Sequence, residues 1–404
     1  MSRFTALLLF ALAAIPVLTL SNGPPAFSAE TGVVTRIEQV APEEIDPATG
    51  LARTTVVRPL RDFPAAQEPR PAPREAIPAD ARPHIALILP TTSPALGRLA
   101  DAVRLGFVAA VEAAGKESPP VTFMPIESEG EQLLDACRNA QRRGAVLVVA
   151  GLTRDGATTL ARSDCPRLPV LALNEPQGIP GDLPANLYHV SLSLEPEARQ
   201  VALQAVADGW HSAIVITSPS PLARRVQEAF EREWVRAAGE VRRVSYSGNP
   251  EDAPLIRERI ASLRGDVVFL ALDQPEARAV RPYITGALPV YATSMSIDPR
   301  ADPTVNVDLQ GVRYVDMPWF VQPDHAAVMV YPVLKGTLSV EQERLYALGI
   351  DAFRLSTLLL RGEPSTVLDG VTGRITLAPG NAFVRTLTPA EVDGGRVTAL
   401  KGPL

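Results

Sequence analysis

Short apolar runs alternate with longer helical segments along most of the chain after residue 83. The first runs are IALILP, VTFMPI, AVLVVAG and LPVLALN, and the segments between them repeat apolar residues every three to four positions. A second series begins near residue 195 with SAIVIT, EVRRVSY, DVVFLAL and LPVYATS. Apolar strands that alternate with helices are typical of parallel sheets covered on both faces.

The two series together contain more strands than one sheet of this kind usually has. We therefore expect an α/β fold with two doubly wound, Rossmann-like lobes. Lobe 1 is predicted at about residues 84–192 and 289–360, and lobe 2 at about 193–288 and 361–400. In this arrangement the long late helix returns to lobe 1 and the C-terminal hairpins complete lobe 2. The arrangement resembles that of type I periplasmic-binding proteins, and we expect it over 84–404.

The N-terminus has the pattern of an export signal. Arg3 precedes an apolar run over residues 4–20, and Ala26 and Ser28 are small residues suited to a signal-peptidase cut before Ala29. This pattern predicts a signal peptide over residues 1–28, and the alternative is an uncut inner-membrane anchor. Both place the remainder outside the cytoplasm, in the periplasm. No other segment is apolar enough to span a membrane.

Proline is the compositional outlier, with 39 residues in a chain of 404. Residues 29–83 are rich in Pro, Ala, Arg and Glu and have few large apolar residues, so we expect a flexible segment there. A docking site for a proline motif is the alternative. No cysteine lies near the end of the signal, so lipid attachment through an N-terminal cysteine is not expected.

Composition excludes several functional classes. A net charge of −6 and 5 % aromatic residues argue against nucleic acid as a partner. Two cysteines and four scattered histidines leave little material for a metal or haem site. The sequence has no G-x-S-x-G, P-loop, G-x-G-x-x-G, H-E-x-x-H or C-x-x-C motif. We therefore expect no enzymatic activity and no cofactor.

Cys137 and Cys165 fall in consecutive predicted helices. In an oxidising compartment an even pair of cysteines is a disulfide candidate. Two separate thiols remain the alternative, because the sequence does not give the distance between them.

Polar residues follow the predicted strands at the edge where doubly wound lobes bind ligands. These candidate cleft residues, which could hold a small polar ligand, are Thr91, Thr92, Ser93, Thr153, Asn174, Thr217 and Asp273. The same residue types are also the ordinary caps of helix N-termini.

Four segments resemble a known family. VYATSMS, LQGVRYVDMPWF, ERLYALGIDAF and LDGVTGRITLAPGN occur in this order between residues 290 and 381. They resemble the C-terminal domain of the LpoA/LppC family of penicillin-binding protein activators, and the resemblance extends over about residues 84–400. The residues that match its motifs are Asp316, Pro318, Trp319, Arg344, Tyr346, Gly349, Asp351, Gly370 and Gly373.

The resemblance implies a type I periplasmic-binding fold that binds a class A penicillin-binding protein and promotes peptidoglycan synthesis without catalysis. It places residues 316–319 at a turn where a strand leaves its lobe, and Arg344 to Asp351 on a helix that crosses back. It places Gly370 and Gly373 in a hairpin. A purely structural role for these residues is the alternative.

Two other functions remain open. The first is a solute-binding protein of an ABC transporter for an amino acid or amide, although the strand-end loops carry almost no aromatic residue. The second is a cell-wall hydrolase, for which the sequence offers no nucleophile or metal set. Relatives of the enterobacterial type carry an N-terminal helical-repeat domain, and the roughly 54 residues after the signal are too few for one.

Overall fold

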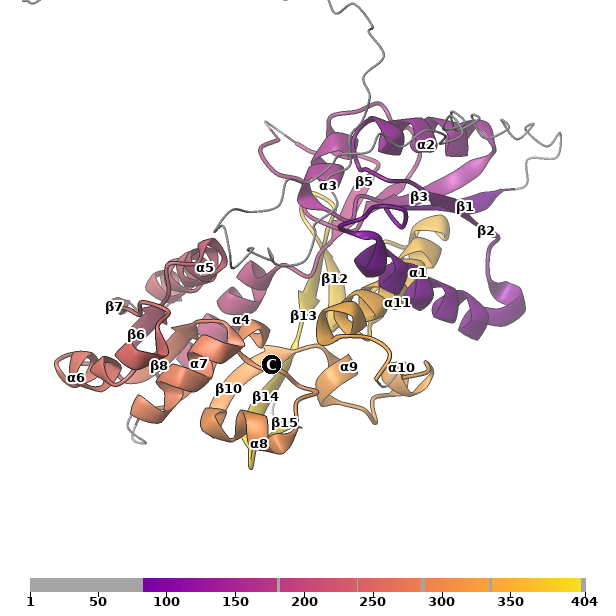
Figure 1. The fold of residues 1–404 in the computed structure, drawn as a ribbon. Coiled ribbons are helices and arrows are strands. Elements are labelled where there is room, and N and C mark those ends of the chain that lie inside the picture. Colours follow the sequence, from indigo (N-terminus) through magenta and orange to yellow (C-terminus); the bar gives the residue numbers. More distant parts are fainter. Residues whose placement is uncertain (1–82, 180–181, 238, 285–287, 334–335, 401–404) are drawn as a thin grey trace, which may run out of the picture. The chain divides into compact units, whose positions relative to one another are not determined.

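The computed structural model describes residues 83–179, 182–237, 239–284, 288–333 and 336–400. They all belong to one compact unit (Figure 1). The predicted signal peptide, and the proline-rich segment up to residue 82, lie outside the described residues.

Lobe 1 contains a sheet with the strand order β11-β12-β13-β5-β4-β3-β1-β2. Its strands are β1 (His84–Leu89), β2 (Val121–Pro125), β3 (Ala145–Ala150), β4 (Val170–Ala172), β5 (Leu187–Val190), β11 (Leu368–Asp369), β12 (Arg374–Ala378) and β13 (Ala382–Thr386). The helices that belong to this lobe are α1 (Gly97–Ala114), α2 (Glu131–Arg142), α3 (Arg154–Ala161) and α11 (Val340–Leu360).

Lobe 2 contains a sheet with the order β15-β14-β10-β9-β8-β6-β7. Its strands are β6 (Ser212–Thr217), β7 (Glu240–Ser245), β8 (Val267–Ala271), β9 (Val290–Ala292), β10 (Val312–Asp316), β14 (Thr388–Asp393) and β15 (Arg396–Ala399). Its main helices are α4 (Leu194–Ala207), α5 (Pro221–Ala237), α6 (Leu255–Ala261) and α7 (Gln274–Val280). Three short helices follow in the chain: α8 (Pro303–Asn306) precedes β10, and α9 (Pro318–Val321) and α10 (Ala326–Met329) lie in the segment that crosses back to lobe 1.

The parallel parts of the two sheets share one topology. In each, the second strand of the series lies at the edge and the first lies beside it, followed by the third, fourth and fifth. The strands β1 and β8 are buried along their whole length, which explains why their sequences are continuous apolar runs. Both lobes are therefore doubly wound, as the sequence predicts. None of the described helices is long and apolar enough to cross a membrane.

The predicted lobe boundaries are wrong in two places. The strands β9 and β10, assigned to lobe 1, belong to lobe 2, because β9 pairs with β8 and β10 pairs with β9. Residues 361–386, assigned to lobe 2, complete the sheet of lobe 1, because β13 pairs in parallel with β5. Only β14 and β15 return to lobe 2. The chain therefore crosses between the lobes near residue 192, between residues 317 and 339, and at Leu387.

The helices α1 and α11 lie side by side in lobe 1 (Figure 1). Two glycines allow their backbones to touch. A Cβ atom on Gly349 would lie 2.1 Å from the carbonyl oxygen of Val103, and one on Gly106 would lie 1.8 Å from that of Tyr346. The rings of Phe107 and Phe353 meet edge to face at a centroid distance of 5.3 Å. Any larger residue at either glycine would separate the helices.

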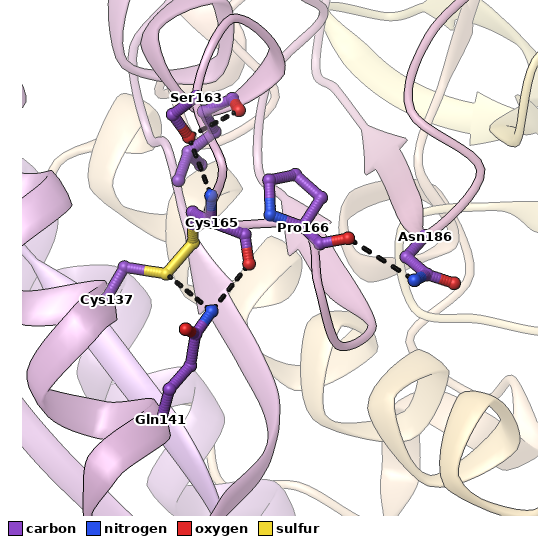
Figure 2. The surroundings of a disulfide bond; sticks show 7 residues. Cys137, Gln141, Ser163, Cys165, Pro166 and Asn186 are labelled. Carbon is purple, nitrogen blue, oxygen red and sulfur yellow. Dashed lines mark hydrogen bonds between the residues drawn. A yellow bond between two sulfur atoms is a disulfide. The ribbon is translucent and has the colours of Figure 1, made fainter.

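A disulfide joins Cys137 on α2 to Cys165, with 6.1 Å between the Cα atoms (Figure 2). The side-chain amide of Gln141, one turn further along α2, donates to the carbonyl oxygen of Cys165 at 2.6 Å. The Cys165 amide donates to the hydroxyl of Ser163 at 3.1 Å. The bridge therefore fastens α2 to the loop that follows α3.

Candidate functional site

The end of strand β10 and the start of helix α11 meet in a buried ion pair between the lobes. Arg344 donates to the two oxygens of Asp316 at 2.5 and 2.9 Å. Asp316 is fully buried and also accepts from the amide of Met317 at 2.8 Å. Two parallel bonds to one carboxylate fix both the distance and the orientation of the groups. The pair thus fixes α11, which packs in lobe 1, to the sheet of lobe 2.

A second contact fastens the first turn of α11 to lobe 2. The carboxylate of Glu343, 4 % exposed, accepts from the guanidinium of Arg300 at 2.8 Å and from the indole of Trp319 at 3.1 Å. The Trp319 ring also lies beside the ring of Tyr346, with the centroids 5.4 Å apart. The residues matched to the family motifs at 316–319 and 344–346 therefore form one packed junction.

Further along α11, Asp351 holds the hairpin that precedes β12. Its buried carboxylate accepts from the amides of Val371 and Thr372 and from the Thr372 hydroxyl, at 2.7 to 3.1 Å. A Cβ atom on Gly370 would lie 2.6 Å from this carboxylate, and Gly373 has φ +135°, which favours glycine. Burial raises the pKa of Asp351 despite the charge of Arg354 and these hydrogen bonds.

A fourth buried carboxylate, that of Glu197, lies where α4 and β13 approach each other. Glu197 accepts from the hydroxyl of Ser294 at 2.7 Å, while the guanidinium of Arg385 lies 3.9 Å from its other oxygen. Both charged side chains are 4 % exposed. Burial raises the pKa of Glu197 to about 7, although Arg385 and Arg344 act in the opposite direction. Burial lowers the pKa of Arg385.

Two cavities lie between the lobes and share the lining residues Leu192, Leu194 and Leu222. The first, about 250 Å³, also has Arg154, Asn174, Ser193, Glu195 and Arg225 in its wall. The second, about 520 Å³, has Glu197, Asp273, Ser294, Asp298, Glu341 and Arg344 in its wall. Both open between strand-end loops of the lobes and the N-terminal half of α11.

The structure brings only two of the predicted cleft residues to these cavities. Asn174 lines the smaller one and Asp273 the larger one. Asp273 also forms a capping box with Glu276 at the start of α7, and Thr153 caps α3. The hydroxyl of Thr153 also donates to Glu129 at 2.6 Å.

The other four predicted residues, Thr91, Thr92, Ser93 and Thr217, are absent from the walls of both cavities. They follow β1 and β6, which places them at strand ends as expected. Strand-end position alone therefore does not determine which side chain reaches the space between the lobes.

Sequence reasoning missed most of the charged residues at these sites. Five of them belong to no motif, and each is recognised only by its ion pair with a residue distant in the sequence. These residues are Arg154, Glu195, Glu197, Arg225 and Arg385. One available signal was the pair of glutamates, Glu195 and Glu197, which lie two residues apart in the first turn of α4.

Comparison with known families identifies the chain over nearly all of the described residues. The family described as "LppC putative lipoprotein" matches residues 79–265 and 263–395. A penicillin-binding protein activator LpoA from Pantoea ananatis is 27 % identical over 67 % of this chain and 46 % of its own length. One from Vibrio antiquarius is 24 % identical over 76 % of this chain and 56 % of its own. The chain thus spans about half the length of these curated relatives.

Solved structures agree with the fold. The C-domain of LpoA from Haemophilus influenzae, described as a regulator of PBP1A, superposes with a TM-score of 0.67 at 23 % identity, covering 79 % of this chain and all of that one. A Chromobacterium violaceum protein described as a "putative branched-chain amino acid ABC transporter" is 35 % identical over 77 % of this chain and all of its own, with a TM-score of 0.66. The predicted periplasmic-binding protein type I fold and the resemblance are confirmed, and the chain belongs to the LppC family.

Proposed function

We propose that this protein is a non-enzymatic regulator of the cell envelope, which binds a class A penicillin-binding protein and raises its synthesis of peptidoglycan. The observation that carries the proposal is the family match, which runs through both lobes from residue 79 to residue 395. The curated relatives in that family are named activators of penicillin-binding proteins. The part shared with them is the two-lobed body, so we assign the docking to this body.

The chemistry of the described residues supports a role without catalysis. The buried charged groups at the junction pair with one another, as Asp316 does with Arg344, and hold elements of the two lobes together. Both cysteines are joined in a disulfide, so neither provides a thiolate nucleophile. Within the described part of the chain, no group of three His, Cys, Asp or Glu side chains could hold a metal ion.

We assign the protein to the periplasm. The predicted export signal supports this location, and so does the disulfide, because such bridges persist in oxidising compartments.

The proposal is tested by binding. The purified protein, immobilised, is expected to retain a purified class A synthase from the same cell and not a monofunctional class B synthase. The Gly349→Val variant, in which the added side chain disrupts the α1–α11 contact, should retain less synthase because the docking body is then destabilised. Failure of the wild-type protein to retain any class A synthase would refute the proposal.

A second candidate function is that of a solute receptor for a transporter. The 35 % identity to the Chromobacterium violaceum protein, which is described as part of an ABC transporter, favours it. A receptor of this kind is stabilised by its ligand by several kcal/mol at saturating concentration. A thermal-shift screen against α-amino acids therefore separates the two: a strong shift without synthase binding supports the receptor.

A further inference from the structure

A further cavity, which we call the α6 pocket, lies beside helix α6 in lobe 2 (Figure 1). Its volume is about 430 Å³, and all nine of its described lining residues belong to lobe 2. Asp266 and Leu288 in its wall come just before the strands β8 and β9, whereas the predicted cleft residue Asp273 follows β8. The α6 pocket is therefore at the opposite edge of the sheet from the two cavities between the lobes, and it shares no lining residue with them.

Two arginines in the wall of the α6 pocket have no carboxylate partner among the described residues. They are Arg257 on α6 and Arg264 in the loop that follows, and both are exposed. The guanidinium of Arg257 lies over the ring of Tyr283, 5.8 Å from its centroid. A cation–π contact of this kind orients the guanidinium group and leaves its N–H groups as donors. The two arginines thus provide charged donors for a carboxylate.

The one acidic residue among the described lining residues, Asp266, provides a hydrogen-bond acceptor. Its Oδ2 atom accepts from the backbone amides of His211 and Ser212, at 3.3 and 3.1 Å. No described residue donates to its other oxygen, Oδ1. The amides at the start of β6 therefore hold the carboxylate in place, while Oδ1 can accept from an N–H group of a ligand.

The remaining wall of the α6 pocket is largely apolar. Ile260 is 5 % exposed, and the half-buried side chains of Leu263, Leu288 and Tyr283 pack against the core of the protein. Burial of an apolar side chain against this surface is favourable. A volume of about 430 Å³ is near the lower end of the range for small-ligand pockets, so the α6 pocket suits a single residue better than a long segment.

We infer that the α6 pocket binds the C-terminal residue of a peptide whose last side chain is apolar. The terminal carboxylate binds Arg257 and Arg264, and the N–H group of the last residue donates to Oδ1 of Asp266. The last side chain packs on Ile260 and Leu263, and the rest of the peptide leaves past the exposed arginines.

A peptide fits the charge of the α6 pocket better than a free amino acid does. Two guanidinium groups and one carboxylate leave the wall with an excess positive charge. The ammonium group of a free amino acid is repelled by this charge, whereas the neutral amide of a peptide is not. The inference does not rest on synthase binding, so failure of one leaves the other standing.

Isothermal titration calorimetry on the purified chain tests the inference with four probes. They are acetyl-Ala-Ala-Leu with a free carboxylate, the same peptide with a C-terminal amide, acetyl-Ala-Ala-Ser with a free carboxylate, and free leucine. The first is expected to bind at least about tenfold more tightly than each of the others. The amide lacks the charge that the arginines bind, the serine peptide lacks the apolar side chain, and leucine carries the ammonium group.

Three results would overturn the inference. The first is the absence of measurable heat with acetyl-Ala-Ala-Leu at millimolar concentration. The second is equal affinity for its amide or for the serine peptide, which would show that the carboxylate or the apolar side chain is not recognised. The third is equal affinity for leucine, which would make the free amino acid the ligand instead of a peptide.

Variants locate the carboxylate of the ligand. Arg257→Gln and Arg264→Gln should each weaken binding of acetyl-Ala-Ala-Leu about tenfold or more and leave the affinity for its amide unchanged. Arg232→Gln on α5 is the matched control, since Arg232 is exposed and is not part of the pocket wall. Wild-type affinity in either pocket variant, with thermal stability equal to that of the wild type, would contradict the assignment.

Discussion

Asp316 and Arg344 join the two lobes through a two-bond ion pair, although they lie 28 positions apart in the sequence. Asp316 ends the strand β10 in the sheet of lobe 2, and Arg344 lies in the second turn of α11 in lobe 1. The Asp316 side chain is 1 % exposed and that of Arg344 17 % exposed. The chain crosses from lobe 2 to lobe 1 between Asp316 and Arg344. The ion pair therefore holds together the two ends of this crossing segment.

Replacement of Asp316 by Asn should destabilise the protein strongly. The change leaves the Arg344 guanidinium buried without its counter-ion, and breaking a buried pair in this way costs about 3–5 kcal/mol. Urea denaturation followed by circular dichroism measures the difference in unfolding free energy.

The matched control is Asp135→Asn, which removes the exposed ion pair of Asp135 with Arg138 on α2. Exposed pairs contribute about 0–1 kcal/mol, so this variant should be close to the wild type. A similar small effect for both variants would show that the junction pair does not stabilise the fold.

Replacement of Gly349 by Ala should lower the melting temperature by several degrees. The added Cβ atom would lie 2.1 Å from the Val103 carbonyl oxygen. This clash can be relieved only if the backbone of α1 or α11 moves. Overpacking of this kind costs about 1–3 kcal/mol or more. The control is Ala113→Ser on the exposed face of α1, for which differential scanning fluorimetry should detect little change.

Reduction of the Cys137–Cys165 disulfide should destabilise the protein. The bridge closes a loop with a sequence separation of 28, for which the chain-entropy relation gives about 3–4 kcal/mol. Thermal melts with and without reductant should differ in the wild type and coincide in a Cys137→Ser, Cys165→Ser double variant. Titration of two free thiols in the untreated protein would contradict the pairing.

Glu197 should make stability depend on pH near neutrality. Burial raises its pKa from 4.5 to about 7, so between these pH values the folded state binds more protons than the unfolded chain. The contribution of this carboxyl group to stability is therefore full below about pH 4.5 and is lost as pH rises through about 7, a change of roughly 3 kcal/mol. Glu197→Gln removes the titration, so its stability relative to the wild type should increase from pH 5 to pH 8.

Glu127→Gln, at an exposed position, controls for the loss of one acidic group. Denaturation midpoints of this variant and the wild type should follow the same pH profile. If Glu197→Gln also follows that profile, the carboxyl group does not titrate differently in the folded state.

The strands could be predicted from the sequence because their apolar runs are local signals. The boundaries of the lobes could not, because the sheet that a strand joins depends on its hydrogen-bonding partner. The strand β9 pairs with β8, and β13 with β5, and neither choice is encoded in the run of residues that forms the strand. A single residue, Leu387, separates β13 from β14, which lie in different sheets.

The candidate site was predicted less completely than the fold. The resemblance singles out Asp316 and Arg344 individually. That they pair with each other depends on how the segment between them folds, which the motifs do not give. Glu197 and Arg385 are separated by most of the fold and come together only when β13 joins the sheet of lobe 1. Polar strand-end residues were easy to find, yet five of the seven do not line either cavity, since local capping satisfies residues such as Thr153.

The most direct test of the account is the rate at which a purified class A synthase polymerises and cross-links lipid-linked disaccharide peptide with increasing amounts of this protein. We predict a rise in rate that saturates with the concentration of the protein, and no product from the protein alone. An unchanged rate at saturating protein, or product formed without the synthase, would contradict the account.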